Sequence, residues 1–198
     1  MDSVIKQDRA RLKLFKKYGY DIPKARNFIL AKAGLSKGKL LEIGTGKGHM
    51  TVALAKKGFS LVSIDLDRKS QRVAGVKLKA LKLDRLAELK IMDAEKLKYK
   101  DKFFDYVISV NFIHHAKNPA RCLKEMIRVT GDQLVIADIN KNGERIMEKV
   151  HRLDGHSHEV SKMSLKETAA LLREGSMKVR VYKDSCQTVL IAKKGVSK

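Results

Sequence analysis

The 198-residue sequence has no tryptophan, only two prolines and only two cysteines. Cys122 and Cys186 show no CxxC spacing, which argues against both a disulfide framework and a cysteine-based zinc site. With 43% hydrophobic residues and so little proline, the chain is neither disordered nor fibrous. It also lacks the apolar core of a signal peptide and any run near the roughly 20 residues of a membrane span. We therefore expect a soluble, cytoplasmic globular protein with reduced thiols and no membrane partner.

Negative charge is scarce as well. The chain has 43 Lys and Arg against 22 Asp and Glu, which gives a formal net charge of +21. Such an excess creates a long-range positive field that attracts anionic partners such as RNA. The basic residues are not interleaved with aromatic ones, however, as they are in proteins that stack single-stranded bases. A lysine-rich solvated surface and an RNA-binding surface both explain the count, and only the second predicts binding that weakens steeply with salt.

The length suits one α/β domain. Residues 1–20 place apolar side chains at helical spacing, and residues 23–33 predict a second helix that ends before Gly34. We expect a single domain in which residues 1–36 form an N-terminal helical cap, a candidate lid, on a catalytic core of residues 37–198.

From residue 39 onward, short apolar runs alternate with helical segments. The runs LLEI, LVSI, LAELKIM, FDYVISV and QLVIADI predict five strands joined by helices, which is the rhythm of βαβ units. After the helical segment SLKETAALLREG, the alternating segments MKVRVYKD and QTVLIAKK predict a hairpin. The expected fold class is α/β, with a doubly wound, Rossmann-like, mainly parallel seven-stranded sheet that ends in a C-terminal antiparallel β-hairpin. Residues 140–163 are expected to be irregular.

The segment LLEIGTGKGHMT is typical of a nucleotide-cofactor turn. A strand ends near Glu42 and leads into three alternate glycines, which permit close backbone approach to a ligand: Gly44, Gly46 and Gly48. A dinucleotide fingerprint would need a glycine in place of His49, and Glu42 would repel a pyrophosphate. A Walker A motif fails because Lys47 is not followed by Ser or Thr. An acidic strand end instead suits S-adenosylmethionine (SAM), which carries a sulfonium and an ammonium.

Two further strands end close to acidic residues. Asp65 ends the second strand, where a carboxylate can accept both hydrogens of a ribose diol. Asp67 is interpreted as the cap of the next helix, although the two aspartates could exchange roles. Asp93 follows the third strand, where it could accept from the adenine amino group beside the Ala94 backbone, and a turn cap is its alternative. Acids at the carboxyl ends of three strands of one sheet favour a shared cofactor site.

The segments EIGTGKG, VSIDLD, MDAEKL and FDYVISVNFIHHAKNPARCLKEMIRV together resemble the class I SAM-dependent methyltransferases, especially their small ubiquinone-biosynthesis-like branch. The resemblance covers about half of the chain and implies SAM as the cofactor and methyl transfer as the reaction. It implies that the glycine turn and the first acid hold the methionine part, the second acid the ribose and the third the adenine. The implied cofactor-binding residues are Glu42, Gly44, Thr45, Gly46, Gly48, Asp65, Leu66, Asp93, Ala94 and Asn111.

The histidines are the candidates for acceptor chemistry. His114 and His115 follow the fourth strand, and His115 is our candidate for a catalytic base or substrate contact, with packing or capping as the alternative. In-line transfer depends mainly on alignment, so the reaction need not use a base. His151, His156 and His158 have no compact zinc spacing, so we expect no metal there but a polar loop or substrate contacts.

Known acceptor motifs are missing from the sequence. The fourth strand leads into NFIHH instead of the Asn-Pro-Pro-aromatic turn that the superfamily uses on base nitrogens, and neither cysteine stands where its RNA cytosine-C5 enzymes carry their nucleophile. The main hypothesis is a SAM-dependent methyltransferase that acts on a small molecule by in-line displacement. An RNA (tRNA or rRNA) methyltransferase and a non-catalytic SAM-binding protein are the alternatives, and no oligomeric state is predicted.

Overall fold

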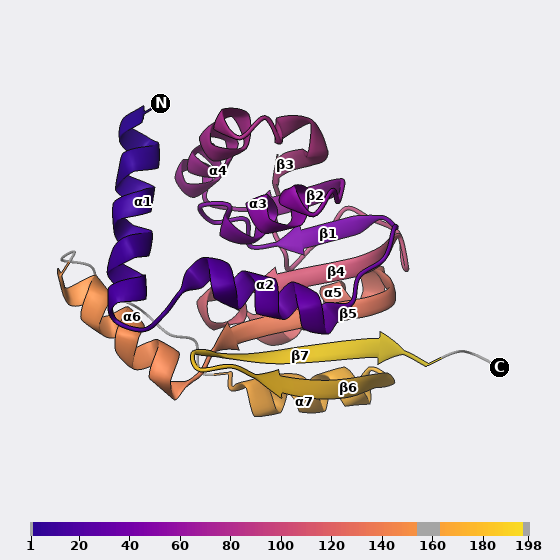
Figure 1. Cartoon of the computed structure of the whole chain (residues 1–198). Coiled ribbons are helices and arrows are strands. Elements are labelled where there is room, and N and C mark those ends of the chain that lie inside the picture. Colours follow the sequence, from indigo (N-terminus) through magenta and orange to yellow (C-terminus); the bar gives the residue numbers. More distant parts are fainter. Residues whose placement is uncertain (1, 154–162, 196–198) are drawn as a thin grey trace.

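The computed structural model describes residues 2–153 and 163–195, and Figure 1 shows how their elements are arranged. In chain order, with η for short 3-10 helices, these elements are α1 (Asp2–Lys17), α2 (Ile22–Ala33), β1 (Leu40–Ile43), α3 (His49–Lys56), β2 (Leu61–Asp65), α4 (Arg68–Ala80), η1 (Asp84–Leu86), β3 (Ala87–Ile91), β4 (Phe104–Val110), η2 (Ile113–His115), α5 (Pro119–Val129), β5 (Thr130–Ile139), α6 (Lys141–Leu153), α7 (Leu165–Glu174), β6 (Met177–Lys183) and β7 (Gln187–Lys194). Every strand that the sequence predicts is present. Among these described helices, none is both long enough and apolar enough to cross a bilayer.

The sheet confirms the predicted fold class. Its seven strands run in the order β3-β2-β1-β4-β5-β7-β6, and β7 pairs antiparallel with both β5 and β6. β1 pairs in parallel with β2 on one side and with β4 on the other. The chain therefore winds outward from β1 in one direction and then, from β4, in the other. Ligands of such sheets bind at the carboxyl ends of the strands beside this reversal.

Helices cover both faces of the sheet (Figure 1). Alternation along β1 sends Leu41 and Ile43 to a core that contains Leu123 of α5 and Leu172 of α7. Leu40 packs on the opposite face in a core built with α2, α3 and α4. Since side chains alternate along a strand, the side chain two positions after Leu40 also points toward α2 and α3. That residue is Glu42, and its hydrogen-bond partners come from α3 and from the adjacent strand β2.

A third cluster lies at the carboxyl edge of the sheet, where α1 and α6 meet. It contains Phe15 and Tyr20 from the N-terminal segment, Ile146 and Val150 from α6, and Cys186. α2 contributes to this cluster through Ile22 and Ala25, and its second half packs into the core under the sheet. α1 and α6 therefore form the wall beside the reversal point.

The expectation that residues 140–163 are irregular is wrong for α6. Ile146, Met147 and Val150 recur at helical spacing and pack toward the core, which stabilises a helix despite the early glycine. That glycine, Gly143, is required by packing, because a Cβ there would collide with the Cys186 carbonyl. Of the three histidines predicted to share an irregular segment, His151 lies on α6. His156 and His158 lie outside the described residues.

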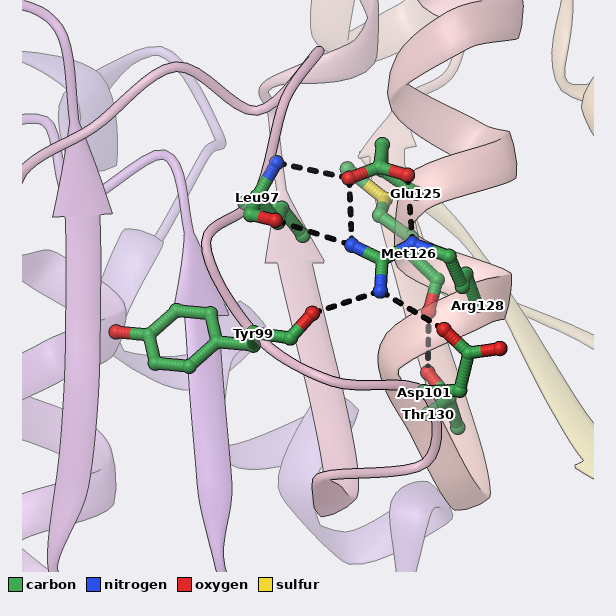
Figure 2. Close-up of polar contacts among 7 residues, drawn as sticks. All are labelled: Leu97, Tyr99, Asp101, Glu125, Met126, Arg128 and Thr130. Carbon is green, nitrogen blue, oxygen red and sulfur yellow. Dashed lines mark hydrogen bonds and ion pairs between the residues drawn. The ribbon is translucent and has the colours of Figure 1, made fainter.

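An arginine fastens the segment between β3 and β4 to α5 (Figure 2). Arg128 donates to the carbonyls of Leu97 (3.0 Å) and Tyr99 (2.7 Å), to Asp101 (2.9 Å) and to both carboxylate oxygens of Glu125 (2.7 and 2.8 Å). Glu125 in turn accepts from the Leu97 backbone amide at 2.8 Å. The clamp therefore fixes the loop that follows the third strand.

Replacing Arg128 with Ala is expected to lower the free energy of unfolding by about 2 kcal/mol, because several backbone and carboxylate acceptors lose a charged donor at once. The matched variant Arg128→Lys keeps the charge but lacks the planar fork, so it should recover less than half of the loss. Urea unfolding of the three proteins measures this. A lysine variant as stable as the wild type would show that charge alone, not the fork, is needed.

Candidate active site

The three glycines of the turn between β1 and α3 share a left-handed conformation but differ in what surrounds them. Gly44, Gly46 and Gly48 all have positive φ angles, of 88°, 47° and 77°. A Cβ on Gly44 would lie 2.8 Å from Phe112, and one on Gly48 would lie 2.7 Å from the Cβ of Ala74. A Cβ on Gly46 would meet nothing within 4 Å. Two of the glycines thus allow close packing, while Gly46 faces open space and leaves its backbone accessible to a ligand.

Glu42 is a buried carboxylate held by two hydroxyls. It is 2% exposed, and its Oε2 accepts from Thr51 Oγ1 at 2.6 Å and from Ser63 Oγ at 2.7 Å. Burial raises the pKa of Glu42 to about 7, and the two hydroxyl donors only partly oppose this effect. A cation seated beside Glu42 would favour its ionised form.

A hydrogen-bonded relay supports this carboxylate from the neighbouring strand and helix. Because Ser63 donates to Glu42, Thr45 must donate in the 2.6 Å contact between the Thr45 and Ser63 hydroxyls. Gln71 Nε2 then donates to Thr45 Oγ1 at 3.3 Å and to the Lys90 carbonyl at 2.9 Å. Thr45, predicted as a cofactor contact, therefore also orders the Ser63 hydroxyl that donates to Glu42.

Arg26 on α2 is a site residue that the sequence interpretation missed. Its side chain is buried, Nη1 donates to the Tyr20 hydroxyl (3.2 Å) and to Gln187 Oε1 (3.4 Å), and its buried Nε has no hydrogen-bond partner within the described part of the chain. Leaving a buried guanidinium nitrogen unsatisfied is costly, so the arrangement fits an anionic ligand group. The signal in the sequence was an arginine on the apolar stripe that α2 forms with Ile22, Ala25 and Ile29.

Asp65 and Asp67 hold different parts of the chain. Asp65 Oδ2 accepts from the Gly46 amide at 2.6 Å, which fastens the end of β2 to the glycine turn. Its Oδ1 accepts from the Asp67 amide at 2.9 Å. Asp67 caps α4 by accepting from the Lys69 amide, as predicted. Asp65 is half-buried and lines a cavity, so its carboxylate is both fixed and within reach of a ligand.

Asp93 caps a turn and also lines a cavity. Its Oδ1 accepts from the Glu95 amide at 2.8 Å, which is the turn cap. It also lines the same cavity as Asp65, together with the buried Ala94 and the exposed Leu66. The third strand end is thus brought to the second, as the sequence predicts.

Asn111 adopts a left-handed conformation, with a φ of 54°, directly after β4. Its amide donates to the Ala137 carbonyl at 2.8 Å. Its side chain accepts from Gln187 Nε2 at 2.7 Å and donates to the Tyr20 hydroxyl at 3.3 Å. This network, which also includes Arg26, locks Asn111 at the reversal point between β1 and β4.

Two cavities meet at this point. We call the one lined by Asp65, Asp93 and Ala94 the acid-lined cavity, of about 570 Å³. The other, the histidine-lined cavity, measures about 300 Å³ and is lined by His114, His115 and His151 together with the buried acid and arginine described above. The residues that line both cavities are Gly44, Gly46, Asn111 and His115. A ligand with two chemically different halves can therefore span the glycine turn.

The two neighbouring histidines differ in their surroundings. His115, the candidate base or substrate contact, lines both cavities. His114 is buried, and its Nδ1 lies 2.5 Å from Asp138 Oδ1. His151, on α6, lines the same cavity as His114. Among the described residues, no group of three or more His, Cys, Asp or Glu side chains is placed to hold a metal ion.

The lid candidate α1 is anchored beside the glycine turn. Asp8 of α1 forms an ion pair with Lys77 of α4 at 2.8 Å. It also lies 3.5 Å from Nε2 of His49, which is the first residue of α3. Burial, followed by the nearby charge of Lys77, holds the pKa of His49 well below its usual value. The ion pair between Asp8 and Lys77 joins α1 to α4 beside the histidine-lined cavity, which Asp8 also lines.

Comparison with protein families places this arrangement in context. A family model described as a methyltransferase domain matches residues 41–136. The phosphatidylethanolamine N-methyltransferase of Cereibacter sphaeroides is 30% identical over 103 residues, which is 51% of this chain and 50% of that protein. The ubiquinone biosynthesis O-methyltransferase of Pseudomonas aeruginosa is 30% identical over 119 residues, 59% of this chain and 50% of that protein. The chain thus spans about half the length of the curated relatives it matches.

Solved structures share the fold over most of the chain. A SAM-dependent methyltransferase from Aquifex aeolicus superposes with a TM-score of 0.68 at 21% identity, covering 97% of each chain. The [4+2]-cyclase SpnF superposes with a TM-score of 0.72 at 14% identity, covering 88% of this chain and 82% of SpnF. A cyclase with the same fold shows that architecture alone does not determine the reaction. The chemistry must be argued from the site.

Proposed function

Because the chain carries a domain of the class I SAM-dependent methyltransferase family, we propose that it transfers the methyl group of SAM to a small-molecule acceptor. The observation that carries the proposal is the meeting of the two cavities at the glycine turn. One cavity offers strand-end carboxylates and the other offers a buried acid beside a buried arginine. This is the donor set for a ligand with a ribose and adenine at one end and a zwitterionic amino acid at the other.

The residues of the chain divide the binding work between the two ends. Asp65 accepts from the ribose hydroxyls, and Asp93 with the Ala94 backbone contacts adenine. At the other end Glu42 accepts from the α-ammonium, while Arg26 donates to the α-carboxylate. SAM, when bound, supplies an electrophilic methyl group on its sulfonium. The protein's contribution is to align an acceptor in the histidine-lined cavity and to exclude water beneath α1 and α6.

A small acceptor is supported by the size of the histidine-lined cavity, about 300 Å³, and by the relatives, which are named as N- and O-methyltransferases. The net charge of +21 favours RNA as the second candidate acceptor. A search with labelled SAM therefore includes both metabolite fractions and RNA. The salt dependence of binding distinguishes the two acceptors. Only an RNA acceptor should bind much more weakly as the salt concentration rises, because the release of its counterions then becomes less favourable.

Calorimetric titration of the purified chain with SAM and S-adenosylhomocysteine (SAH) tests the proposal at its base. We expect micromolar binding of both and none of NAD. Asp65→Ala should weaken binding roughly 10- to 100-fold, because charge-assisted hydrogen bonds to the ribose contribute about 1.5–3 kcal/mol. Asp132→Ala serves as the matched control, because it removes an exposed acid near the start of β5, away from the edge of the sheet that carries the site.

Unchanged SAM affinity in Asp65→Ala would place the ribose elsewhere and contradict the assignment of the acid-lined cavity. Failure of the wild type to bind either compound would contradict the proposed function itself. Tight SAM binding without methyl transfer to any metabolite or RNA fraction would favour the non-catalytic alternative.

A further inference from the structure

A third cavity lies between α1 and the helices beside it. It measures about 360 Å³, and we call it the α1 cavity. The four helices that line it, α1 to α4, each do so with residues three or four positions apart, which share one face of a helix. On α1 these include Ile5, Arg9 and Leu12, and on α3 they include Val52, Ala53 and Lys56. One stripe of each helix thus faces a common space.

Much of the lining of this cavity is apolar. Leu12, Ile22 and Val52 contribute to its walls. Ile5 of α1 and Leu81, the cap residue of α4, also line it, although both lie outside the three hydrophobic clusters of the described residues. Pockets for small ligands are mostly apolar and measure roughly 300–1,000 Å³. The size and the walls of the α1 cavity therefore fit the apolar body of one small ligand.

The charge around the cavity is mostly positive. Among the described residues that line it, Asp8 is the one acid, and its ion pair with the buried Lys77 leaves it without an excess of negative charge. Arg9, Lys56 and Lys57 also line the cavity, are exposed, and form no ion pair with any described residue. Because these three cations are exposed, they stand at the mouth of the cavity, where they attract an anionic group.

The α1 cavity adjoins the histidine-lined cavity without coinciding with it. The residues that line both are Asp8, Leu12, Ile22, Arg26 and His49. Of the residues to which we assign SAM contacts, Arg26 is the one that lines the α1 cavity, and the glycines and strand-end acids do not. A ligand in the α1 cavity therefore leaves room for the cofactor, and both can be bound at once.

We propose that the α1 cavity binds a single-chain amphiphile with an anionic head. Its chain lies along the apolar walls of α1, α2 and α3, and its head meets Arg9, Lys56 and Lys57 at the mouth. The head is a carboxylate or a phosphate, since cationic side chains bind both through charge-assisted contacts. The inference goes beyond the proposed function and does not depend on it, because binding at this cavity needs no methyl transfer.

Calorimetry of the full chain at low salt tests the proposal with three probes, each kept below the concentration at which it forms micelles: decanoate, decyl phosphate and decyltrimethylammonium. Decanoate or decyl phosphate should bind at one saturable site, and the tighter of the two identifies the head group. Shortening its chain by two carbons should weaken binding roughly tenfold, because two fewer methylenes are buried. Decyltrimethylammonium has the same chain and the opposite charge, so it should bind much more weakly.

Two variants address the walls and the mouth separately. Ala80→Trp adds a bulky side chain to the cavity from an exposed position at the end of α4. It should weaken the anionic amphiphile roughly tenfold or more, because the chain and the indole compete for the same space, and leave SAH affinity unchanged. The double variant Lys56→Glu with Lys57→Glu should weaken it roughly fivefold, since each exposed charge contributes little. Circular dichroism checks folding, and the double variant carries the test if Ala80→Trp does not fold.

Lys13→Glu with Lys79→Glu is the matched control. Both lysines are exposed and neither lines the α1 cavity. The control changes the net charge as much as the lysine pair at the mouth does, so it reduces the general positive field alone. We expect it to bind the amphiphile about as well as the wild type. An equal loss in the two double variants would assign the effect to the long-range field and overturn the proposed site.

No saturable binding of decanoate or decyl phosphate, equal binding of decyltrimethylammonium, or full affinity in either test variant would each overturn the inference. The titration is repeated with SAH bound. Displacement of the amphiphile by SAH would place it in the histidine-lined cavity and would also overturn the inference. Failure to bind SAH would instead contradict the proposed function, and the result with the free chain would still decide whether the α1 cavity is a binding site.

Discussion

Glu42→Gln should weaken SAM binding at least 100-fold at pH 8. Removing one partner of a buried charge pair commonly costs 2–5 kcal/mol, and here the α-ammonium would lose its carboxylate. Gln is nearly isosteric and can still accept from Thr51 and Ser63, so the pocket should keep its shape. Calorimetry with SAM measures the loss. Affinity within threefold of the wild type would show that the ammonium does not lie at Glu42.

The same substitution is expected to stabilise the protein in the absence of SAM. Burial raises the pKa of Glu42 from 4.5 to about 7. Between these values the folded state binds more protons than the unfolded state, so stability falls as pH rises through the window. At 1.36 kcal/mol per pKa unit, the full cost above pH 7 is up to about 3 kcal/mol. Glu42→Gln removes it, which urea unfolding at pH 8 and pH 5 detects as a gain at pH 8 alone.

The affinity for SAM should also depend on the protonation of Glu42, but it should rise with pH, whereas the stability of the free protein falls. Below about pH 7 the free protein carries a proton on Glu42, and SAM must displace it, so affinity should fall up to tenfold per pH unit. Binding near pH 6 should release a proton, which calorimetry in buffers of different ionisation enthalpy reports. The Gln variant should show neither effect. A pH-independent wild type would contradict an ionised Glu42 in the complex.

Arg26→Gln should weaken SAM and SAH at least 30-fold and leave 5′-methylthioadenosine unaffected. The last compound keeps adenosine and sulfur but has no amino acid, so it does not reach Arg26. The expected loss of about 2 kcal/mol or more is typical when one member of a buried ion pair is truncated. Asp65→Ala should give a different pattern, because it should weaken the binding of all three ligands. Equal losses for SAM and methylthioadenosine in Arg26→Gln would indicate general damage to the pocket instead of a lost carboxylate contact.

The parts of the fold that could be predicted are those set by local pattern. Strand periodicity, the cap at Asp67 and the Gly34 stop depend on neighbours within a few residues, and the structure confirms them. α6 was missed because Gly143 near its start resembles a loop signal, while the reason for that glycine is a contact with Cys186. Such a contact has no local signature.

The site divides in the same way. Glu42, Asp65 and Asp93 lie at or just beyond the ends of parallel strands, and such ends share one edge of the sheet, so their placement around the glycine turn was predictable. Arg26 and Gln187 are 161 positions apart, and the pairing of His114 with Asp138 depends on the adjacency of β4 and β5. Pairs of side chains that are far apart in the sequence could be identified only from the strand order of the folded sheet. For this reason His115 was singled out in the sequence, and the carboxylate partner of His114 emerged from the structure.

The most direct test of the central claim is a crystal structure of the full chain with SAH. We expect the ribose hydroxyls on Asp65, adenine beside Asp93 and Ala94, and the amino-acid end between Glu42 and Arg26. SAH bound with its amino acid away from Glu42 and Arg26, or outside both cavities, would contradict the assignment of the site.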